Sequence, residues 1–179
     1  MLSCTSAMPR LPIALMNELD LIRSQLHSER SRVVEVARAC AAPGAAPQLR
    51  QTALDYLVFV MTRFEERDQM LAEQYRSRLA ASDPARREAE TTLSRSGTSR
   101  EALATLEAAL GSGKDGATSP QLWIAFAQFV EGPWRSRRDA IDALLERNTR
   151  VADWRAVSFV DADSIVEERA RYARVPRAP

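Results

Sequence analysis

Apolar side chains recur along most of the chain at alternating spacings of three and four residues, the period of an α-helix that packs on one side. The first such run consists of Leu15, Leu19, Ile22, Leu26, Val33, Val36 and Cys40. Glu29 occupies the one position at which this apolar stripe should continue. The run stops before Pro43, which cannot continue a helix, and Gly44, which tolerates a left-handed turn. The pattern predicts a core-facing helix with one charged position near its middle.

A second run has the same period and the same kind of interruption. It consists of Leu54, Leu57, Met61, Phe64, Leu71 and Tyr75. Asp68 stands between Phe64 and Leu71, where the next apolar residue is expected. After this run, Ser82 and Asp83 can cap a helix and Pro84 suits its first turn, so a third helix is predicted to begin there.

The third helical region is predicted to be broken or bent. Residues 85–95 are polar, and Gly97 interrupts them. Thr98 and Glu101 then form a plausible capping box, which is followed by the apolar positions Leu103, Leu106 and Leu110. We therefore expect a broken or bent helix in this region.

Ser119 and Pro120 open a further helix by the same capping logic. Its bulky apolar face consists of Leu122, Trp123, Phe126, Phe129 and Val130. Gly132 and Pro133 predict a kink or short break, because proline removes a helical hydrogen bond. Beyond it the stripe resumes at Ile141, Leu144 and Leu145. A last helix is indicated by Trp154, Val157, Val160, Ile165, Val166 and Tyr172.

No segment alternates between polar and apolar residues as a strand would. We therefore predict an all-α fold, specifically an up-and-down four-helix bundle with an additional C-terminal helix. With 179 residues, 45% of them hydrophobic, the chain can bury one sizeable core. The expected organisation is a flexible N-terminal tail over residues 1–12, a single bundle domain over residues 13–173 and a C-terminal tail over residues 174–179.

Composition argues against several classes of protein. The net charge of +1 provides no general attraction to nucleic acid or acidic membranes, and acids match the arginines along the same helices. The longest apolar stretch, Tyr56 to Met61, is far too short to span a bilayer, and residues 1–16 lack the pattern of a signal peptide. Cys4 and Cys40 form no disulfide framework. We expect a cytoplasmic protein that binds neither nucleic acid nor membranes.

The charges in the middle of the helices are the main candidates for chemistry. Glu29, Asp68 and either Arg137 or Arg138 face inward if the stripes are continuous. The favoured interpretation places them at the rim of the core, because apolar stripes drift around a straight helix and buried charge is rare. A buried ion pair and a metal site are the alternatives. A guanidinium in the same cavity opposes cation binding by Coulomb repulsion.

The remaining candidate residues point to no catalytic site. His27, the only histidine, lies beside the Leu26 stripe position and is expected to face solvent or the rim. No arrangement of nucleophile, base and acid can be built around it with any specificity, so we expect no enzyme. The Gly111 to Gly116 segment contains Lys114 but lacks the spacing and the preceding strand of a phosphate-binding loop.

Two helices carry a resemblance to a known family. Leu19-Asp20-Leu21-Ile22 followed by Gln25-Leu26 resembles the first helix of bacterial hemerythrin-like (HHE) domains, in which an acid and a histidine stand at the last two positions. The start at Tyr56-Leu57 and the stretch from Arg63 to Leu71 are similar to that family's second helix. Glu65 and Glu66 then occupy the positions of adjacent histidine ligands, and Gln69 lies near that of an acid.

The fourth predicted helix extends this resemblance. Asp153-Trp154 matches a pair beyond the family's fourth helix, but Trp134 occupies its histidine position and Arg138 its glutamate position. The resemblance implies the family's bundle fold without its di-iron chemistry, because Leu26, Trp134 and Arg138 offer no donor suited to iron.

We therefore expect a metal-free, hemerythrin-like bundle without cofactor that acts as a regulatory module by binding a protein partner or by self-association. Its layout is also similar to that of bacterial regulators that bind sigma factors. One alternative is a non-haem iron- and oxygen-binding protein; its candidate ligands are Glu29, Asp68, Glu65, Glu66 and His27. A second alternative is a small-molecule sensor with an aromatic pocket of Trp123, Phe126 and Trp134 beside Pro133.

Overall fold

The computed structural model describes residues 13–93, 98–111, 120–147, 155 and 162–176, and no strand occurs among them. The chain order is α1 (Ile13–Ala41), α2 (Pro47–Arg78), α3 (Pro84–Leu93), α4 (Thr98–Gly111), α5 (Pro120–Phe129), η1 (Val130–Trp134), α6 (Arg135–Arg147) and α8 (Ala162–Arg174). The all-helical fold class predicted from the periodicity is thereby confirmed for this part of the chain.

Local chemistry explains where the helices begin and end. Helix α1 ends at Ala41, just before Gly44, whose φ of +78° lies in the left-handed region. The Asp83 side chain accepts a hydrogen bond of 2.8 Å from the N–H of Ala85 and caps the start of α3. Proline occupies the first position of α2, α3 and α5, where its missing N–H costs nothing. The end of α1 and the starts of α3 and α5 agree with the sequence signals, whereas the start of α2 at Pro47 was not predicted.

The predicted kink or break at Gly132 and Pro133 takes a different form. The chain stays helical through η1, a π-helical turn that joins α5 to α6. The N–H of Arg135 reaches back to the carbonyl of Val130, five residues earlier, as in a π-helix. We infer that this wider turn accommodates Pro133, which has no N–H to donate, without ending the helix.

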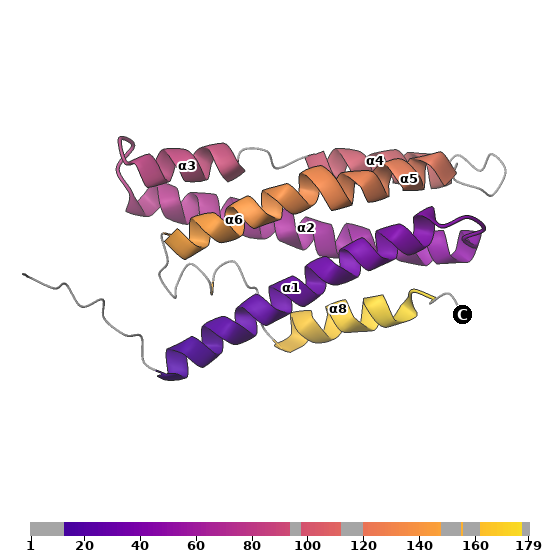
Figure 1. Ribbon diagram of the computed structural model, residues 1–179, viewed down its shortest axis with the longest axis horizontal. Coiled ribbons are helices and arrows are strands. Elements are labelled where there is room, and N and C mark those ends of the chain that lie inside the picture. Colours follow the sequence, from indigo (N-terminus) through magenta and orange to yellow (C-terminus); the bar gives the residue numbers. More distant parts are fainter. Residues whose placement is uncertain (1–12, 94–97, 112–119, 148–154, 156–161, 177–179) are drawn as a thin grey trace, which may run out of the picture.

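Helix α2 occupies the centre of the arrangement. It packs against α1, α3, α4 and α8, while α1 also contacts α5 and η1, and α3 contacts α6. Figure 1 shows α3 and α4 end to end along one edge of the molecule and α8 along the opposite edge beside α1. The buried apolar residues form one core cluster, whose largest fully buried members include Trp123, Tyr56, Tyr75, Leu57 and Met61. Because α2 has neighbours on several sides, it buries more than a single stripe.

Several sequence expectations lie outside the described residues: the tail 1–12 with Cys4, Lys114 with most of its loop, and the positions Asp153, Trp154, Val157 and Val160. Helix α8 ends at Arg174, and Val175 is buried, with its N–H donating to the carbonyl of Tyr172. Among the described helices, none combines the length and the apolar character needed to cross a membrane.

Candidate functional site

A layer of charged side chains crosses the core near the middle of α1 and α2 and at the start of α6. We call it the central charged layer; it consists of Glu29, Arg63, Arg67, Asp68, Arg137 and Arg138. Glu29 is 0% exposed and Asp68 is 1% exposed. The structure therefore does not place these carboxylates at the rim of the core, as favoured from sequence, but inside it. Drift of the apolar stripe does not expose them, because neighbouring helices cover these positions.

Glu29 joins α1 to α2. One of its carboxylate oxygens accepts a hydrogen bond of 3.1 Å from Gln25, one turn earlier on α1. The other accepts a hydrogen bond of 2.9 Å from Nη1 of Arg67, and Nη2 of Arg63 lies 3.6 Å from the carboxylate. Sequence analysis identified Glu29 but missed both arginine partners.

Asp68 joins α2 to α6. Arg138 donates to both of its oxygens, with 2.9 Å between Nη1 and Oδ1. Arg137 donates a further hydrogen bond of 2.7 Å to Oδ2. Such two-pronged contacts between a guanidinium and a carboxylate are charge-assisted and directional. The sequence left open which of the two arginines faces inward, and both bind the same carboxylate.

Aromatic rings pack within this layer. The guanidinium carbons of Arg67 and Arg138 lie 5.1 Å and 5.3 Å from the centre of the Phe64 ring. Trp134 meets Phe64 edge to face at 5.5 Å and also lies within 5.9 Å of Arg138. These cation–π contacts help to compensate for the water that the guanidiniums lose on burial.

The electrostatic balance of the layer is positive. Arg63, Arg67 and Arg138 are buried beside only two carboxylates, Glu29 and Asp68. Burial lowers the pKa of Arg67; Glu29 opposes this shift, whereas the charges of Arg63 and Arg138 add to it. A metal cation placed here would be repelled by these guanidiniums. Among the described residues, no group of three or more His, Cys, Asp or Glu side chains is arranged to hold a metal ion.

The positions that the sequence resemblance aligned with metal ligands make other contacts in the structure. Leu26 and Trp134 pack in the core, and Arg138 binds Asp68. Glu65 is buried and accepts a hydrogen bond of 3.2 Å from the N–H of Arg100, at the start of α4. Its charge there suits the positive end of a helix dipole.

The two other substituted positions, Glu66 and Gln69, are exposed on the surface of α2. His27 is also exposed, as expected, and lines a hollow of about 370 Å³ between α1 and the start of α6. The candidate iron ligands named from sequence are therefore divided between the core and the surface. The structure does not bring them together.

The predicted aromatic pocket also separates into two parts. Trp123 and Phe126 contact each other edge to face at 6.1 Å and are buried in the core. Trp134 instead packs on Phe64. It lines the hollow beside His27 and a second one of about 470 Å³ that also contains Phe129, Pro133 and Arg137.

A second buried charge cluster was missed by sequence analysis. Glu168 on α8 is 0% exposed and receives a two-pronged contact from Arg32, with distances of 2.8 Å and 2.6 Å. The hydroxyl of Tyr56 donates a third hydrogen bond of 2.8 Å to the same carboxylate. Burial and the adjacent Glu168 charge raise the pKa of Tyr56, so its hydroxyl remains a donor at neutral pH. Glu168 stands three residues after Ile165 and four before Tyr172, so it interrupts the apolar stripe of its helix as Glu29 and Asp68 do, a signal that could have identified it.

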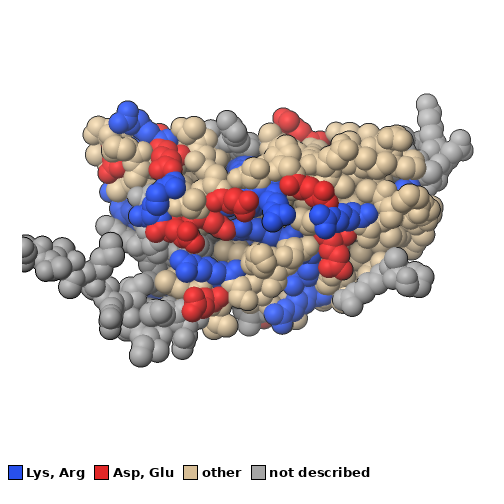
Figure 2. Space-filling model, in the orientation of Figure 1, with Lys and Arg blue, Asp and Glu red and all other residues tan. Residues whose placement is uncertain are grey.

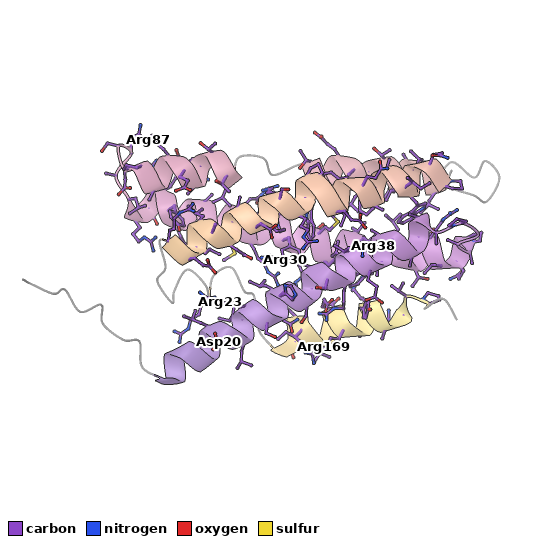
Figure 3. The ribbon with its side chains drawn as sticks, in the orientation of Figure 1. Asp20, Arg23, Arg30, Arg38, Arg87 and Arg169 are labelled. Atoms are coloured by element: carbon purple, nitrogen blue, oxygen red, sulfur yellow. The ribbon has the colours of Figure 1, made fainter. Side chains whose placement is uncertain are left out.

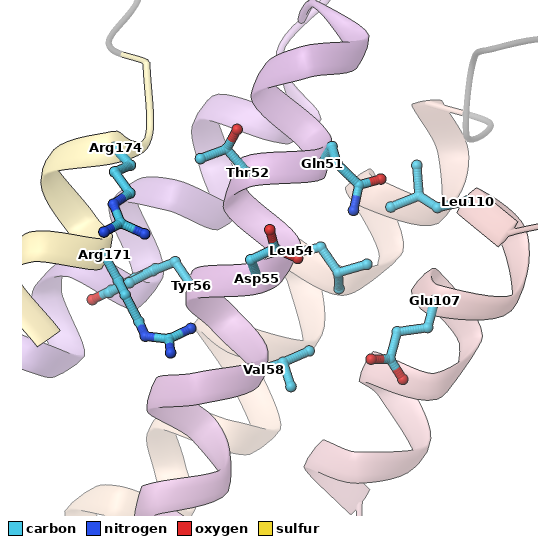
Figure 4. Close-up of a pocket in the computed structure, with 10 residues that line it drawn as sticks. All are labelled: Gln51, Thr52, Leu54, Asp55, Tyr56, Val58, Glu107, Leu110, Arg171 and Arg174. Carbon is cyan, nitrogen blue, oxygen red and sulfur yellow. The ribbon is translucent and has the colours of Figure 1, made fainter. Parts of the chain in front are cut away.

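Charged contacts nearer the surface complete the arrangement. Arg30 extends from α1 toward α6 (Figure 3), where it makes two hydrogen bonds of 2.6 Å with Asp142. A hollow of about 500 Å³ lies between α2, α4 and α8 (Figure 4). Arg171 and Arg174 border it on one side and Glu107 on the other, so its walls carry both signs of charge.

The geometry of the central charged layer can hold helices in register, but it presents no nucleophile and no cluster of metal ligands within the described residues. Comparison with known proteins adds no information about the role of this layer. No family model matches the chain. Searches of curated proteins and of solved structures likewise found no match.

Proposed function

We propose that this chain is a metal-free, hemerythrin-like four-helix bundle of up-and-down topology, with α8 as an additional helix. The course of the chain in Figure 1 supports the topology, since α2 returns alongside α1, and α5, η1 and α6 return alongside α3 and α4. The order of the contacts supports it as well, because α1 packs on α2 and α5 while α3 packs on α2 and α6.

We further propose that the bundle acts as a regulatory module by binding a protein partner or a second copy of itself. The observation that carries this proposal is the central charged layer. Its carboxylate oxygens, which a metal would need as ligands, accept hydrogen bonds from arginines instead. Because ion pairs and apolar packing occupy the centre of the bundle, we expect its function to be binding at the surface.

The surface formed by α5 and the adjoining part of α4 is the favoured contact region. On the face shown in Figure 2, this end of the molecule is mostly uncharged, whereas acidic and basic side chains alternate over α1 and α6. Helix α5 contains no charged residue. Its exposed positions are Pro120, Gln121, Ala125 and Gln128, and Leu122, Ile124 and Phe129 are half-buried beside them. Depletion of charge is a property of the central part of protein interfaces.

Size-exclusion chromatography with light scattering across a range of concentrations tests self-association. Ala125→Glu introduces a charge at an exposed position of α5 and should shift the oligomer toward monomer. Ala173→Glu makes the same change at an exposed position of α8 and should leave the oligomer intact. A wild-type protein that is monomeric throughout would contradict self-association, and co-purification of a partner sensitive to Ala125→Glu would then be required.

The iron-binding alternative is tested by elemental analysis of protein produced with iron supplied. Metal binding by Glu29 or Asp68 would require displacement of their guanidinium partners, so we expect far less than one iron per chain. Near-stoichiometric iron that is lost in Asp68→Ala would contradict the metal-free proposal.

One observation favours a second candidate, a small-molecule sensor. The hollow beside the π-helical turn combines an apolar wall of Phe129, Pro133 and Trp134 with the hydroxyls of Thr92 and Ser136. A ligand bound there should change the fluorescence of Trp134 but not that of a Trp134→Phe variant. An unchanged spectrum across a panel of metabolites would count against this candidate.

A further inference from the structure

Arg67 is a buried cation with unused hydrogen-bond donors. Its side chain is 0% exposed, and it donates from Nη1 to Glu29. Its Nε and Nη2 groups are buried and have no hydrogen-bond partner among the described residues. A buried donor without a partner is costly, and such a group calls for a bound water or ion.

The Nε and Nη2 groups form one edge of the planar guanidinium, and the same structure shows how that edge is used elsewhere. In Arg32, Nε and Nη2 each bind one oxygen of the Glu168 carboxylate, at 2.8 Å and 2.6 Å. Two parallel N–H groups are the arrangement that recognises a carboxylate or a similar anion. In Arg67, Glu29 binds Nη1, so the Nε and Nη2 donors of the corresponding edge are not used by that carboxylate.

The charge of the surroundings favours an anion as the missing partner. The buried members of the central charged layer are three guanidiniums and two carboxylates, which leaves one positive charge in excess. An uncompensated charge is strongly unfavourable in a region that excludes water. One monovalent anion would balance these five buried groups and also accept hydrogen bonds from the two open donors.

We propose that the central charged layer binds one small monovalent anion, chloride or a short carboxylate such as formate, at the Nε–Nη2 edge of Arg67. This site is independent of the surface function proposed above. Chloride and a short carboxylate each carry one negative charge and can accept hydrogen bonds from both N–H groups. We expect a small anion because Arg67 is fully buried.

Thermal unfolding at constant ionic strength tests the proposal, with gluconate replaced stepwise by chloride in one series and by formate in another. Gluconate is too large for the site, so the wild-type midpoint should rise with the logarithm of the concentration of the smaller anion, as expected for a ligand of the folded state. The series that saturates at the lower concentration identifies the preferred anion. Equal midpoints in gluconate, chloride and formate would overturn the site.

Two matched variants locate the response. Arg67→Lys keeps the charge and a donor for Glu29 but loses the fork, and it should weaken anion affinity at least tenfold. Arg32→Lys makes the same change at a fork already filled by Glu168 and should keep the wild-type anion response. An undiminished response in Arg67→Lys would overturn the proposal, since the anion would then bind elsewhere.

A crystal of the wild-type protein grown or soaked in bromide gives a direct measurement, even if Arg67→Lys does not fold. We expect an anomalous peak within hydrogen-bonding reach of both Nε and Nη2 of Arg67, weakened when formate is added. Peaks confined to surface arginines would overturn the proposal.

Discussion

Two carboxylates, Glu29 and Asp68, are paired with arginines inside the core, where an unpaired charge would be strongly unfavourable. Asp68→Asn keeps the shape of the side chain but removes the negative charge that faces Arg138. We expect a loss of about 3 kcal/mol in the free energy of unfolding, measured by urea denaturation, because a buried guanidinium loses its partner.

Asp55→Asn is the matched control on the same helix. Asp55 is exposed, so its replacement should change the free energy of unfolding by no more than about 0.5 kcal/mol. Equal effects of the two substitutions would show that Asp68 does not contribute a buried ion pair.

Cys40 is a second residue whose behaviour follows from burial. Burial raises the pKa of its thiol from 9.0 to about 12, although the charge of Arg50 opposes the shift. Between these values the unfolded chain loses a proton that the folded chain keeps, so stability should fall as the pH rises above 9.

In a Cys4→Ser background at pH 8, a disulfide reagent should label Cys40 roughly 100-fold more slowly in folded than in urea-unfolded protein. Equal labelling rates would contradict its burial.

At the scale of single helices, two glycines provide opposite tests of backbone geometry. A Cβ atom at Gly132, inside the π-helical turn, would meet nothing within 4 Å, so Gly132→Ala should stabilise the protein by about 0.5–1 kcal/mol. Gly44 has space too, but its φ of +78° disfavours a side chain, and Gly44→Ala should destabilise by about 1 kcal/mol. Urea denaturation measures both, and effects of the same sign would contradict this assignment of backbone strain.

Helix α8 is held largely by polar contacts around Glu168. Val166 on its outer face is 65% exposed, whereas Glu168 is fully buried between Arg32 and Tyr56. Glu168→Gln should cost about 3 kcal/mol of docking free energy, because it removes the charge that Arg32 faces. Hydrogen exchange of residues 162–176 should then become roughly 100-fold faster if this helix detaches locally.

The neighbouring Glu167→Gln is the control for this prediction. Glu167 is exposed and pairs with Arg171 within α8, a contact that contributes less than about 0.5 kcal/mol. Similar exchange rates in the two variants would mean that Glu168 does not hold α8 in place.

At the scale of the whole molecule, one core cluster includes buried residues from α1 through α6 and Val175 just beyond α8. A shared core predicts a single cooperative unfolding transition. Circular dichroism and tryptophan fluorescence should give coincident thermal curves, and the calorimetric and van't Hoff enthalpies should agree. A separate transition at lower temperature would mean that part of the chain unfolds independently, and α8 would be the main candidate.

Much of the helical layout could be predicted because its determinants are local. The end of α1 near Pro43, the cap at Asp83 and the start of α5 at Pro120 depend on the backbone chemistry of a few adjacent residues. The π-helical turn at Pro133 was predicted only as an irregularity. Whether a proline breaks a helix or is absorbed in a wider turn depends on how the two flanking segments pack.

Part of the candidate site was also predictable. The interrupted stripes identified Glu29 and Asp68, and they narrowed the arginines of α6 to two neighbours. Arg63 and Arg67 gave no such signal. They lie beside the apolar stripe of α2, and only the packing of further helices around α2 buries them.

The sequence by itself determined that the chain forms helices, where several of them start and stop, and that two carboxylates interrupt the apolar stripes. These properties follow from side-chain period and backbone chemistry, which act over a few residues. Only the tertiary structure decided that the carboxylates are buried, that Arg67 and Arg138 are their partners, and that Glu168 anchors α8. Such pairs join residues far apart in the chain, and the free energy of a charge depends on which neighbours replace its water.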